Sequence, residues 1–311
     1  MKEFIITTGL FLSVCIISII CVFCLADSRT DEYYIKLTTP KQSSLIVGSS
    51  RAAQGIQPQY INMQLNNEKV YNYAFSRVHT PYGKAYLNSI KRKLDKQSKD
   101  GVFILEVNPW VISSQTKNPE DSLNFQDNNS FAEVVKCVNC NPNFEYLVYS
   151  YDKSYRHILL DKIKENKINT NVDVNGWCEV NFLKNKTESF DKIHSQTIKR
   201  YAQILNRYSG VSETRINYLE RTIKYLQQYG TTYLVRLPVS NEMLAIENKL
   251  IGNFDAKMDN LSNKLNTVYL NFMMDNEKYN YIDSHHLDKK SGEQISKYIA
   301  EQIINNKNTK F

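Results

Sequence analysis

Residues 101–107, Gly-Val-Phe-Ile-Leu-Glu-Val, form the clearest buried strand of the sequence. A nearly continuous apolar run of this length is typical of a strand that is covered on both faces, and such strands are typical of parallel sheets. Further short apolar runs predict strands at 44–47, 69–74, 231–237 and 267–272. Because helical patterns separate these runs, we expect an α/β fold with a mainly parallel sheet between two layers of helices.

Apolar residues recur at helical spacing in four segments, 81–94, 212–229, 240–265 and 291–304. The stretch 111–210 interrupts the alternation of strands and helices, because it is polar and rich in Asn with scattered Tyr. It is too long for a plain loop. We therefore expect a variable, partly helical insertion between the third and fourth strands.

One apolar run lies at the N-terminus, over residues 4–26, while the chain as a whole is polar, with a mean hydropathy of −0.46. About 20 apolar residues suffice for a helix to span a bilayer. Lys2 precedes the run and acidic residues from Asp27 to Glu32 follow it, so the positive-inside rule predicts a cytoplasmic N-terminus and an extracytoplasmic domain. A cleaved signal peptide is the alternative, which the length of the run and the poor cleavage site at Cys24-Leu25-Ala26 disfavour.

The 311 residues therefore divide into a predicted membrane anchor over 1–26, a polar linker over 27–43 and one domain over 44–311. Hydrophobic residues make up 42% and charged residues 23%, which excludes a disordered or fibrous chain. The net charge of +7 would allow the domain to lie near anionic lipid or anionic glycopolymer. The Lys residues are scattered and no Arg-rich patch with interleaved aromatics is found, so we do not expect a nucleic-acid partner.

Three of the six cysteines lie in the apolar run, and Cys137, Cys140 and Cys178 lie outside it. The Cys137-Val-Asn-Cys140 motif has no second pair or His partners at zinc-ligand spacing. A thioredoxin-like context for a redox motif is also missing. Outside the cytoplasm, a local disulfide between Cys137 and Cys140 is the simplest interpretation, with Cys178 left over or paired with one of the two.

Polar residues follow the predicted strands at the edge of the sheet where ligands of parallel sheets bind. The first strand is followed by Gly48-Ser49-Ser50-Arg51, the third by Asn108-Pro109-Trp110, and the fifth by 281–287, which holds one Asp and two His. A Ser, an Asn, an Asp and a His at one edge are the parts of a nucleophilic acyl-transfer site. In such a site a His takes the proton of the Ser, an Asp orients the His, and neutral donors hold the oxyanion.

The segment Leu45 to Arg51, together with the C-terminal Asp283-x-x-His286 pair, resembles the SGNH/GDSL hydrolase superfamily. The resemblance covers about residues 44–304 and is nearest to its membrane-anchored branch, which serves O-acylation of envelope polysaccharide and D-alanylation of teichoic acid. It implies a three-layer α/β/α fold, with Ser50 as nucleophile, His286 as base and Asp283 as the residue that orients His286. It implies no metal and no organic cofactor.

The resemblance also implies three donors to the oxyanion, which are the main-chain N–H groups of Ser50 and Arg77 and the side chain of Asn108. The chain departs from the family at two blocks, because Arg77 stands where a Gly is usual and Pro109 replaces an Asp. Such departures are milder for an acyltransferase than for a hydrolase. Arg51 is expected to contact the substrate, and a salt bridge beneath the turn is the alternative role.

The resulting hypothesis is an extracytoplasmic serine esterase or O-acyltransferase that acts on a small acyl ester of a cell-envelope glycan. If the chain is a transferase, the resemblance implies a multi-spanning acyl exporter in the same membrane as its partner. A non-catalytic envelope assembly or binding protein that retains the fold is the first alternative, and the altered blocks favour it. A redox protein that uses Cys137 and Cys140 is the second.

Overall fold

The computed structural model describes residues 1–65, 69–163, 170–180 and 190–308. Its centre is a five-stranded sheet in the order β2-β1-β3-β6-β7, and every neighbouring pair of strands runs parallel. The strands are β1 (Ser44–Val47), β2 (Val70–Asn72), β3 (Gly101–Glu106), β6 (Gly230–Arg236) and β7 (Val268–Asn271). The α/β class and the mainly parallel sheet are thus confirmed, and each of the five predicted strands is found.

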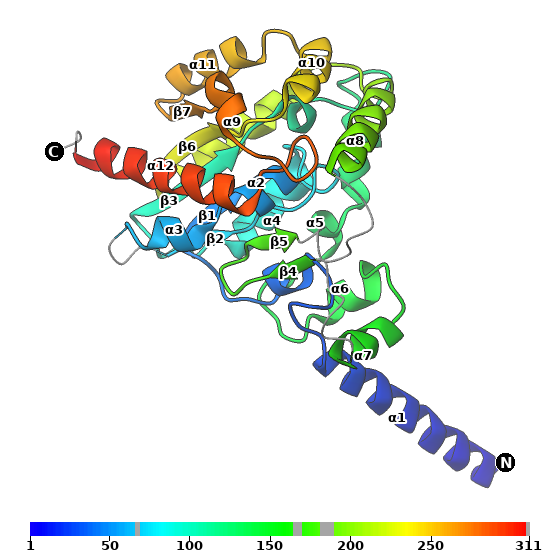
Figure 1. The fold of residues 1–311 in the computed structure, drawn as a ribbon. Helices are drawn as coiled ribbons and strands as arrows, with labels where there is room; N and C mark the ends of the chain where they lie inside the picture. The colour runs from blue at the N-terminus through cyan, green and yellow to red at the C-terminus, as the bar shows by residue number, and fades with distance from the viewer. Residues whose placement is uncertain (66–68, 164–169, 181–189, 309–311) are drawn as a thin grey trace.

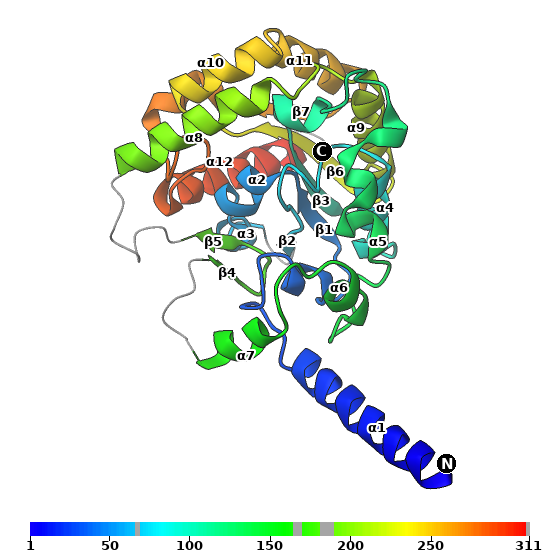
Figure 2. The ribbon, with the colours of Figure 1, turned by 90° about the vertical axis from the view of Figure 1, so that its right-hand side faces the viewer.

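Helices cover both faces of this sheet, which Figures 1 and 2 show from two directions. One face carries α2 (Ser50–Gly55), α3 (Pro58–Asn62) and α12 (Lys289–Asn308); the other carries α4 (Lys84–Lys93), α9 (Glu213–Leu226) and α11 (Phe254–Lys264). Successive residues of β3 alternate between the two cores: Val102 and Ile104 pack in the core of α12, while Phe103 and Leu105 pack in the core of α4 and α9. This double coverage explains why the strand is apolar throughout.

The predicted helix over 240–265 is two helices in the structure, α10 (Asn241–Leu250) and α11. Ser240 begins the first, because its hydroxyl accepts the main-chain N–H of Met243 at 3.3 Å. Ile251 then takes an extended conformation, which ends α10, and Gly252 lies in the connection to α11. Gly252 and Asn253, which disfavour a helix interior, lie at this break, so the predicted single helix over 240–265 is wrong there.

The stretch 111–210 contains short helices and a two-stranded antiparallel ribbon, as expected for a partly helical insertion. Its regular elements are α5 (Phe131–Val134), α6 (Phe144–Tyr149), α7 (Arg156–Ile163), β4 (Thr170–Val172), β5 (Cys178–Val180) and α8 (Phe190–Leu205). Residues 164–169 and 181–189 of the predicted insertion lie outside the described residues. Helix α8 packs beside α10 in a third apolar cluster, where Tyr201 meets Trp110 and Met243.

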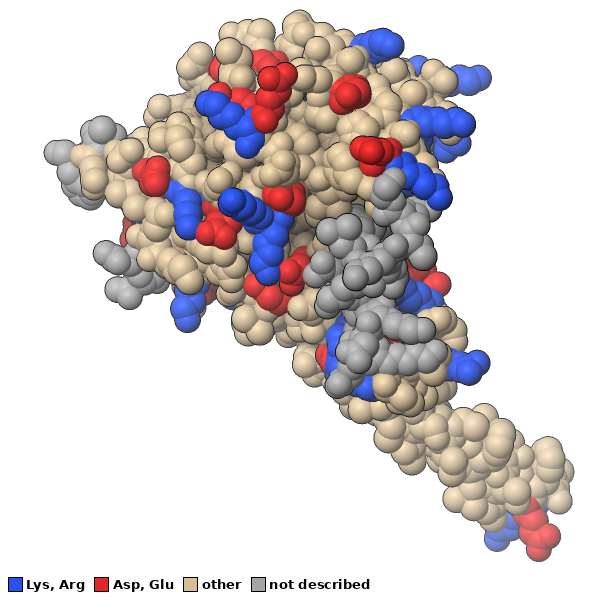
Figure 3. Space-filling view, viewed as in Figure 1, with Lys and Arg blue, Asp and Glu red and all other residues tan. Residues whose placement is uncertain are grey.

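Helix α1 (Lys2–Cys24) is the one helix in the described residues that is long and apolar enough to cross a membrane. It projects away from the domain, and Figure 3 shows charge on it only near its free end. Its last turn meets the insertion, since the ring of Phe23 lies 5.8 Å from Phe144 and 4.9 Å from Tyr155, measured between centroids.

The segment 27–43, expected to be a polar linker, is instead packed into the domain. It contains a short 3₁₀ helix, Tyr34–Leu37, in which Tyr34, Lys36 and Leu37 are almost completely buried. Their burial shows that the predicted linker packs against the domain. The Nζ of Lys36 donates to the carbonyl of Ala74 at 2.6 Å, which attaches the segment to the chain just after β2.

Candidate active site

The turn after β1 brings Ser50 to the edge of the sheet. Gly48 has φ of +148°, and a Cβ at this position would lie 2.6 Å from the Cβ of Glu106, so only glycine fits. Ser49 then caps α2, because its hydroxyl accepts the N–H of Arg51 at 3.3 Å. Ser50 is therefore the first residue of a helix that begins at the carboxyl end of a parallel strand, where ligands of such sheets bind.

A chain of hydrogen bonds joins Ser50 to two residues that lie more than 200 positions away. His286 Nε2 lies 2.8 Å from Ser50 Oγ, and His286 Nδ1 lies 2.9 Å from Asp283 Oδ2. Because an ionised carboxylate only accepts hydrogen bonds, Nδ1 carries the ring proton, and Nε2 is left as the acceptor for the hydroxyl of Ser50. The three residues thus have the order and the spacing of a nucleophile, a base and an orienting acid.

The loop before α12 holds Asp283 in place and keeps it ionised. Asp283 Oδ1 accepts the main-chain N–H groups of Ser284, His285 and His286 at 2.6, 3.0 and 3.0 Å. Burial alone would raise the pKa of Asp283, but the electrostatic and hydrogen-bonding interactions with His286 and His285 hold it well below its usual range. The carboxylate is therefore a fixed negative charge that can stabilise a protonated His286.

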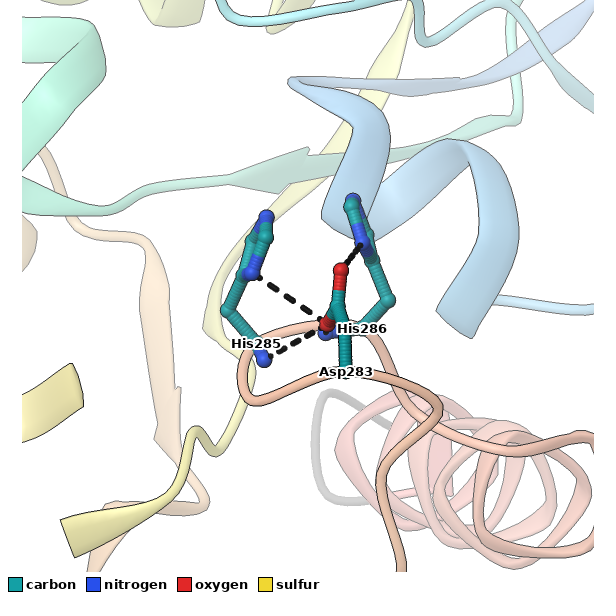
Figure 4. A group of neighbouring side chains, drawn as sticks. All are labelled: Asp283, His285 and His286. Carbon is teal, nitrogen blue, oxygen red and sulfur yellow. Dashed lines mark hydrogen bonds and ion pairs between the residues drawn. The ribbon is translucent and has the colours of Figure 1, made fainter. Parts of the chain in front are cut away.

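His285 lies beside this triad but has a different environment. Figure 4 shows Asp283 between the two rings, and the His285 and His286 centroids are 3.9 Å apart. His285 is buried, its Nε2 lies 3.0 Å from the hydroxyl of Tyr201, and burial lowers its pKa to about 3. It is neutral at ordinary pH, and its contact with Tyr201 links the triad loop to helix α8 of the insertion. His286 is thus the histidine that faces Ser50.

The donor atoms of Asp283, His285 and His286 lie within 4.8 Å of one another, which is close enough for a metal ion. The hydrogen bonds of these atoms argue against such a site. Both nitrogens of His286 are engaged, and Asp283 Oδ1 already accepts three main-chain N–H groups, whose partial positive charge would repel a cation. The residues fit a proton relay better than a cation site.

Glu106 and Asn108 hold the turn by hydrogen bonds to Ser49. Glu106 Oε2 accepts both the N–H and the hydroxyl of Ser49, at 2.8 and 2.9 Å. Asn108 Nδ2 donates to Glu106 Oε1 at 2.6 Å and to Ser49 Oγ at 3.2 Å, while its Oδ1 accepts N–H groups at the start of the following 3₁₀ helix, Pro109–Ile112. Both amide hydrogens of Asn108 therefore have acceptors, so in this structure the side chain serves the turn and offers no free donor to an oxyanion.

Arg51 and Arg77 lie near the turn with separate partners. The side chain of Arg51 is 3% exposed and forms a buried ion pair with Glu247, so the salt bridge is the role that the structure supports and substrate contact is not. The guanidinium of Arg77 donates to the hydroxyl of Tyr208 at 2.9 Å and lies 5.6 Å from the ring centroid of Tyr201. Its main-chain N–H, and that of Ser50, make no hydrogen bond to any described residue.

A small pocket adjoins Ser50, and no sequence motif marks most of the residues that form its wall. The wall includes Glu32, Tyr33 and Lys36 from the segment that had been expected to be a linker. Burial lowers the pKa of Lys36 to about 8. These residues are more than ten positions before the Gly48-Ser49-Ser50 turn and belong to no motif, so only the fold reveals that they line the site.

Cys137 and Cys140 form a disulfide, as expected, with their Cα atoms 5.9 Å apart. Cys178 is buried and unpaired. No protein-family model matches the chain, and no curated protein is significantly similar to it. The case for a function therefore rests on the geometry of Ser50, His286 and Asp283.

Proposed function

We propose that the chain is a membrane-anchored serine esterase or O-acyltransferase of SGNH type. The observation that supports this proposal best is the hydrogen-bond chain from Ser50 Oγ through His286 to Asp283, at the carboxyl end of a parallel sheet. A structural role alone would not require an ionised Asp held by three N–H groups behind a histidine whose unprotonated nitrogen accepts the hydroxyl of a serine.

In the proposed reaction, Ser50 Oγ attacks the carbonyl carbon of an ester while its proton passes to His286 Nε2. The negative charge of Asp283 stabilises the resulting imidazolium. The oxyanion is held by the main-chain N–H groups of Ser50 and Arg77, which have no partner among the described residues. The imidazolium then gives its proton to the departing alcohol, which leaves the acyl group on Ser50. Water or a sugar hydroxyl takes this group in the second half of the cycle, again with His286 as base.

The proposed substrate follows from the proposed location. Helix α1 would hold the domain at the outer face of a membrane, where acylated envelope glycans are within its reach. In the transferase version of the proposal, a multi-spanning exporter in the same membrane delivers the acyl group. A non-catalytic assembly protein is the rival function, and the engaged amide of Asn108 is the observation that favours it.

The test uses the full chain in detergent and follows hydrolysis of 4-nitrophenyl acetate. We expect Ser50→Ala and His286→Ala to lose at least about 100-fold in rate, as is usual when a nucleophile or a general base is removed. His157→Ala is the matched control, because His157 is exposed on α7 and lies outside the site. If hydrolysis is equal in Ser50→Ala and the wild type, Ser50 is not the nucleophile. If the folded wild type has no activity, the rival function is favoured.

A further inference from the structure

A larger cavity lies against the pocket beside Ser50. It has a volume of about 610 Å³, which is within the range of about 300–1,000 Å³ that is usual for small-molecule sites. We call it the polar cavity and define it by Asp31, Ser130, Phe131 and Asp152, with Glu32 and Tyr33 as the wall that it shares with the Ser50 pocket. The two hollows are therefore neighbours on either side of one short segment.

The lining of the polar cavity combines aromatic rings with hydrogen-bonding groups. The rings of Tyr33 and Phe131 have centroids 5.1 Å apart, and His79 lies 4.5 Å from Phe131. Ser130 is 6% exposed, and its hydroxyl has no hydrogen-bond partner among the described residues. Because an unpaired buried hydroxyl is unfavourable, this group indicates a ligand or a water that supplies the missing partner. Aromatic side chains beside a hydroxyl that has no partner suit a ligand with both C–H surface and OH groups.

The charged residues that line the polar cavity restrict the charge of the ligand. Four carboxylates line the cavity, from Asp31, Glu32, Asp152 and Asp161, against the two cations Arg29 and Lys153. The cavity is thus acidic although the chain carries a net charge of +7. Burial raises the pKa of Asp31, which moderates this charge without reversing it. A polyanionic glycan would be repelled here, whereas a neutral sugar or one that carries an amine would not.

We infer that the polar cavity binds the sugar units of a neutral or amine-bearing glycan, whose hydroxyl is esterified or de-esterified at Ser50. The inference rests on the proposed function for the reaction and on the cavity alone for the binding. The sugar lies in the polar cavity, and its esterified hydroxyl is directed past Glu32 and Tyr33, which line both hollows, toward Ser50. The glycan is then bound by the segment that directly follows the membrane anchor.

Binding is measured on the full chain in detergent by saturation-transfer NMR and calorimetry, in the Ser50→Ala background so that nothing is turned over. The probes are triacetylchitotriose and maltotriose, which are neutral, chitotriose, which carries amines, and trigalacturonate, which is an anion of the same length. We expect at least one neutral or amine trimer to bind at least tenfold more tightly than trigalacturonate. Ser150→Trp, which fills the cavity, abolishes this binding, and Tyr298→Ala, on the exposed face of α12, leaves it unchanged.

Two results overturn the inference: none of the uncharged or amine trimers binds, or Ser150→Trp binds them as well as the parent does. Equal or tighter binding of trigalacturonate also overturns it. The fold of Ser150→Trp is checked in the chain with Ser50 intact, by its thermal unfolding and by labelling of Ser50 with a fluorophosphonate. Glycan binding without labelling in the wild type would support the polar cavity as a glycan site and reject the proposed chemistry at Ser50. Labelling without glycan binding would support the chemistry and reject the glycan site.

Discussion

Glu106→Gln tests whether one buried carboxylate holds the turn that presents Ser50. The two oxygens of Glu106 accept three hydrogen bonds, two from Ser49 and one from Asn108, in a fully buried position. A glutamine offers one oxygen and one NH₂ group. In either orientation of its amide, the NH₂ group faces another donor, which is the main-chain N–H of Ser49 or the Nδ2 of Asn108. Asn108 cannot resolve this conflict by flipping its amide, because its Oδ1 accepts two main-chain N–H groups.

The expected cost of this substitution is that of one buried donor without an acceptor, about 1–3 kcal/mol. For a domain of this size the cost corresponds to a fall of about 2–6 °C in melting temperature. Displacement of Ser50 adds a loss in reactivity, since a shift of about 1 Å can cost about 100-fold. Thermal unfolding and the rate of fluorophosphonate labelling measure the two effects.

Glu301→Gln is the matched control for Glu106→Gln, because it removes the same charge from an exposed position on α12. It is expected to change the free energy of unfolding by no more than about 0.5 kcal/mol. If Glu106→Gln melts and reacts like the wild type, the carboxylate does not hold the turn, and our account of how Ser50 is positioned is wrong.

Three further predictions follow from the same region. Gly48→Ala places a Cβ 2.6 Å from that of Glu106 at a φ of +148°, so we expect a loss of more than about 2 kcal/mol in thermal unfolding, or failure to fold. The pKa of Asp283 is lower in the folded chain than in the unfolded chain, where it is about 3.9, so its stabilisation is complete above about pH 5 and is lost as the pH falls. Asp283→Asn should therefore lower the melting temperature at pH 7, and the difference from the wild type should narrow at pH 3; a constant difference would contradict this assignment. Burial raises the pKa of Cys178 to about 12, so N-ethylmaleimide at pH 8 should modify it only after denaturation, as read by peptide mapping.

The sheet was predictable because its strands are short, apolar and buried on both faces. Phe103 and Leu105 face one core while Val102 and Ile104 face the other, so the run at 101–107 could belong only to a covered strand. The Ser50 turn and the Asp283-x-x-His286 loop were predictable for a related reason. The Ser50 turn directly follows β1, and the Asp283-x-x-His286 loop lies between β7 and α12. The topology of a parallel sheet therefore brings the two segments to the same edge.

Other parts of the site depend on contacts that local patterns do not encode. Lys36 lies in a polar stretch, yet it is buried and lines the same pocket as Ser50, because its Nζ donates to the carbonyl of Ala74. Tyr201 contacts His285 from the stretch 111–210, which the sequence predicts only as a partly helical insertion. The amide of Asn108 was assigned to an oxyanion, but Glu106 and Ser49 engage it, and sequence position alone does not distinguish the two environments.

The central claim is that Ser50 is an activated nucleophile, and covalent labelling tests it most directly. The full chain in detergent is treated with a fluorophosphonate, digested and mapped by mass spectrometry, alongside Ser50→Ala and Ser49→Ala. We predict a phosphonyl group on Ser50 in the wild type, none in Ser50→Ala, and slower labelling that is still on Ser50 in Ser49→Ala, because His286 Nε2 contacts Ser50 while the hydroxyl of Ser49 bonds to Glu106 and holds the turn. A folded wild type that is never labelled, or a label that persists in Ser50→Ala, would contradict the claim.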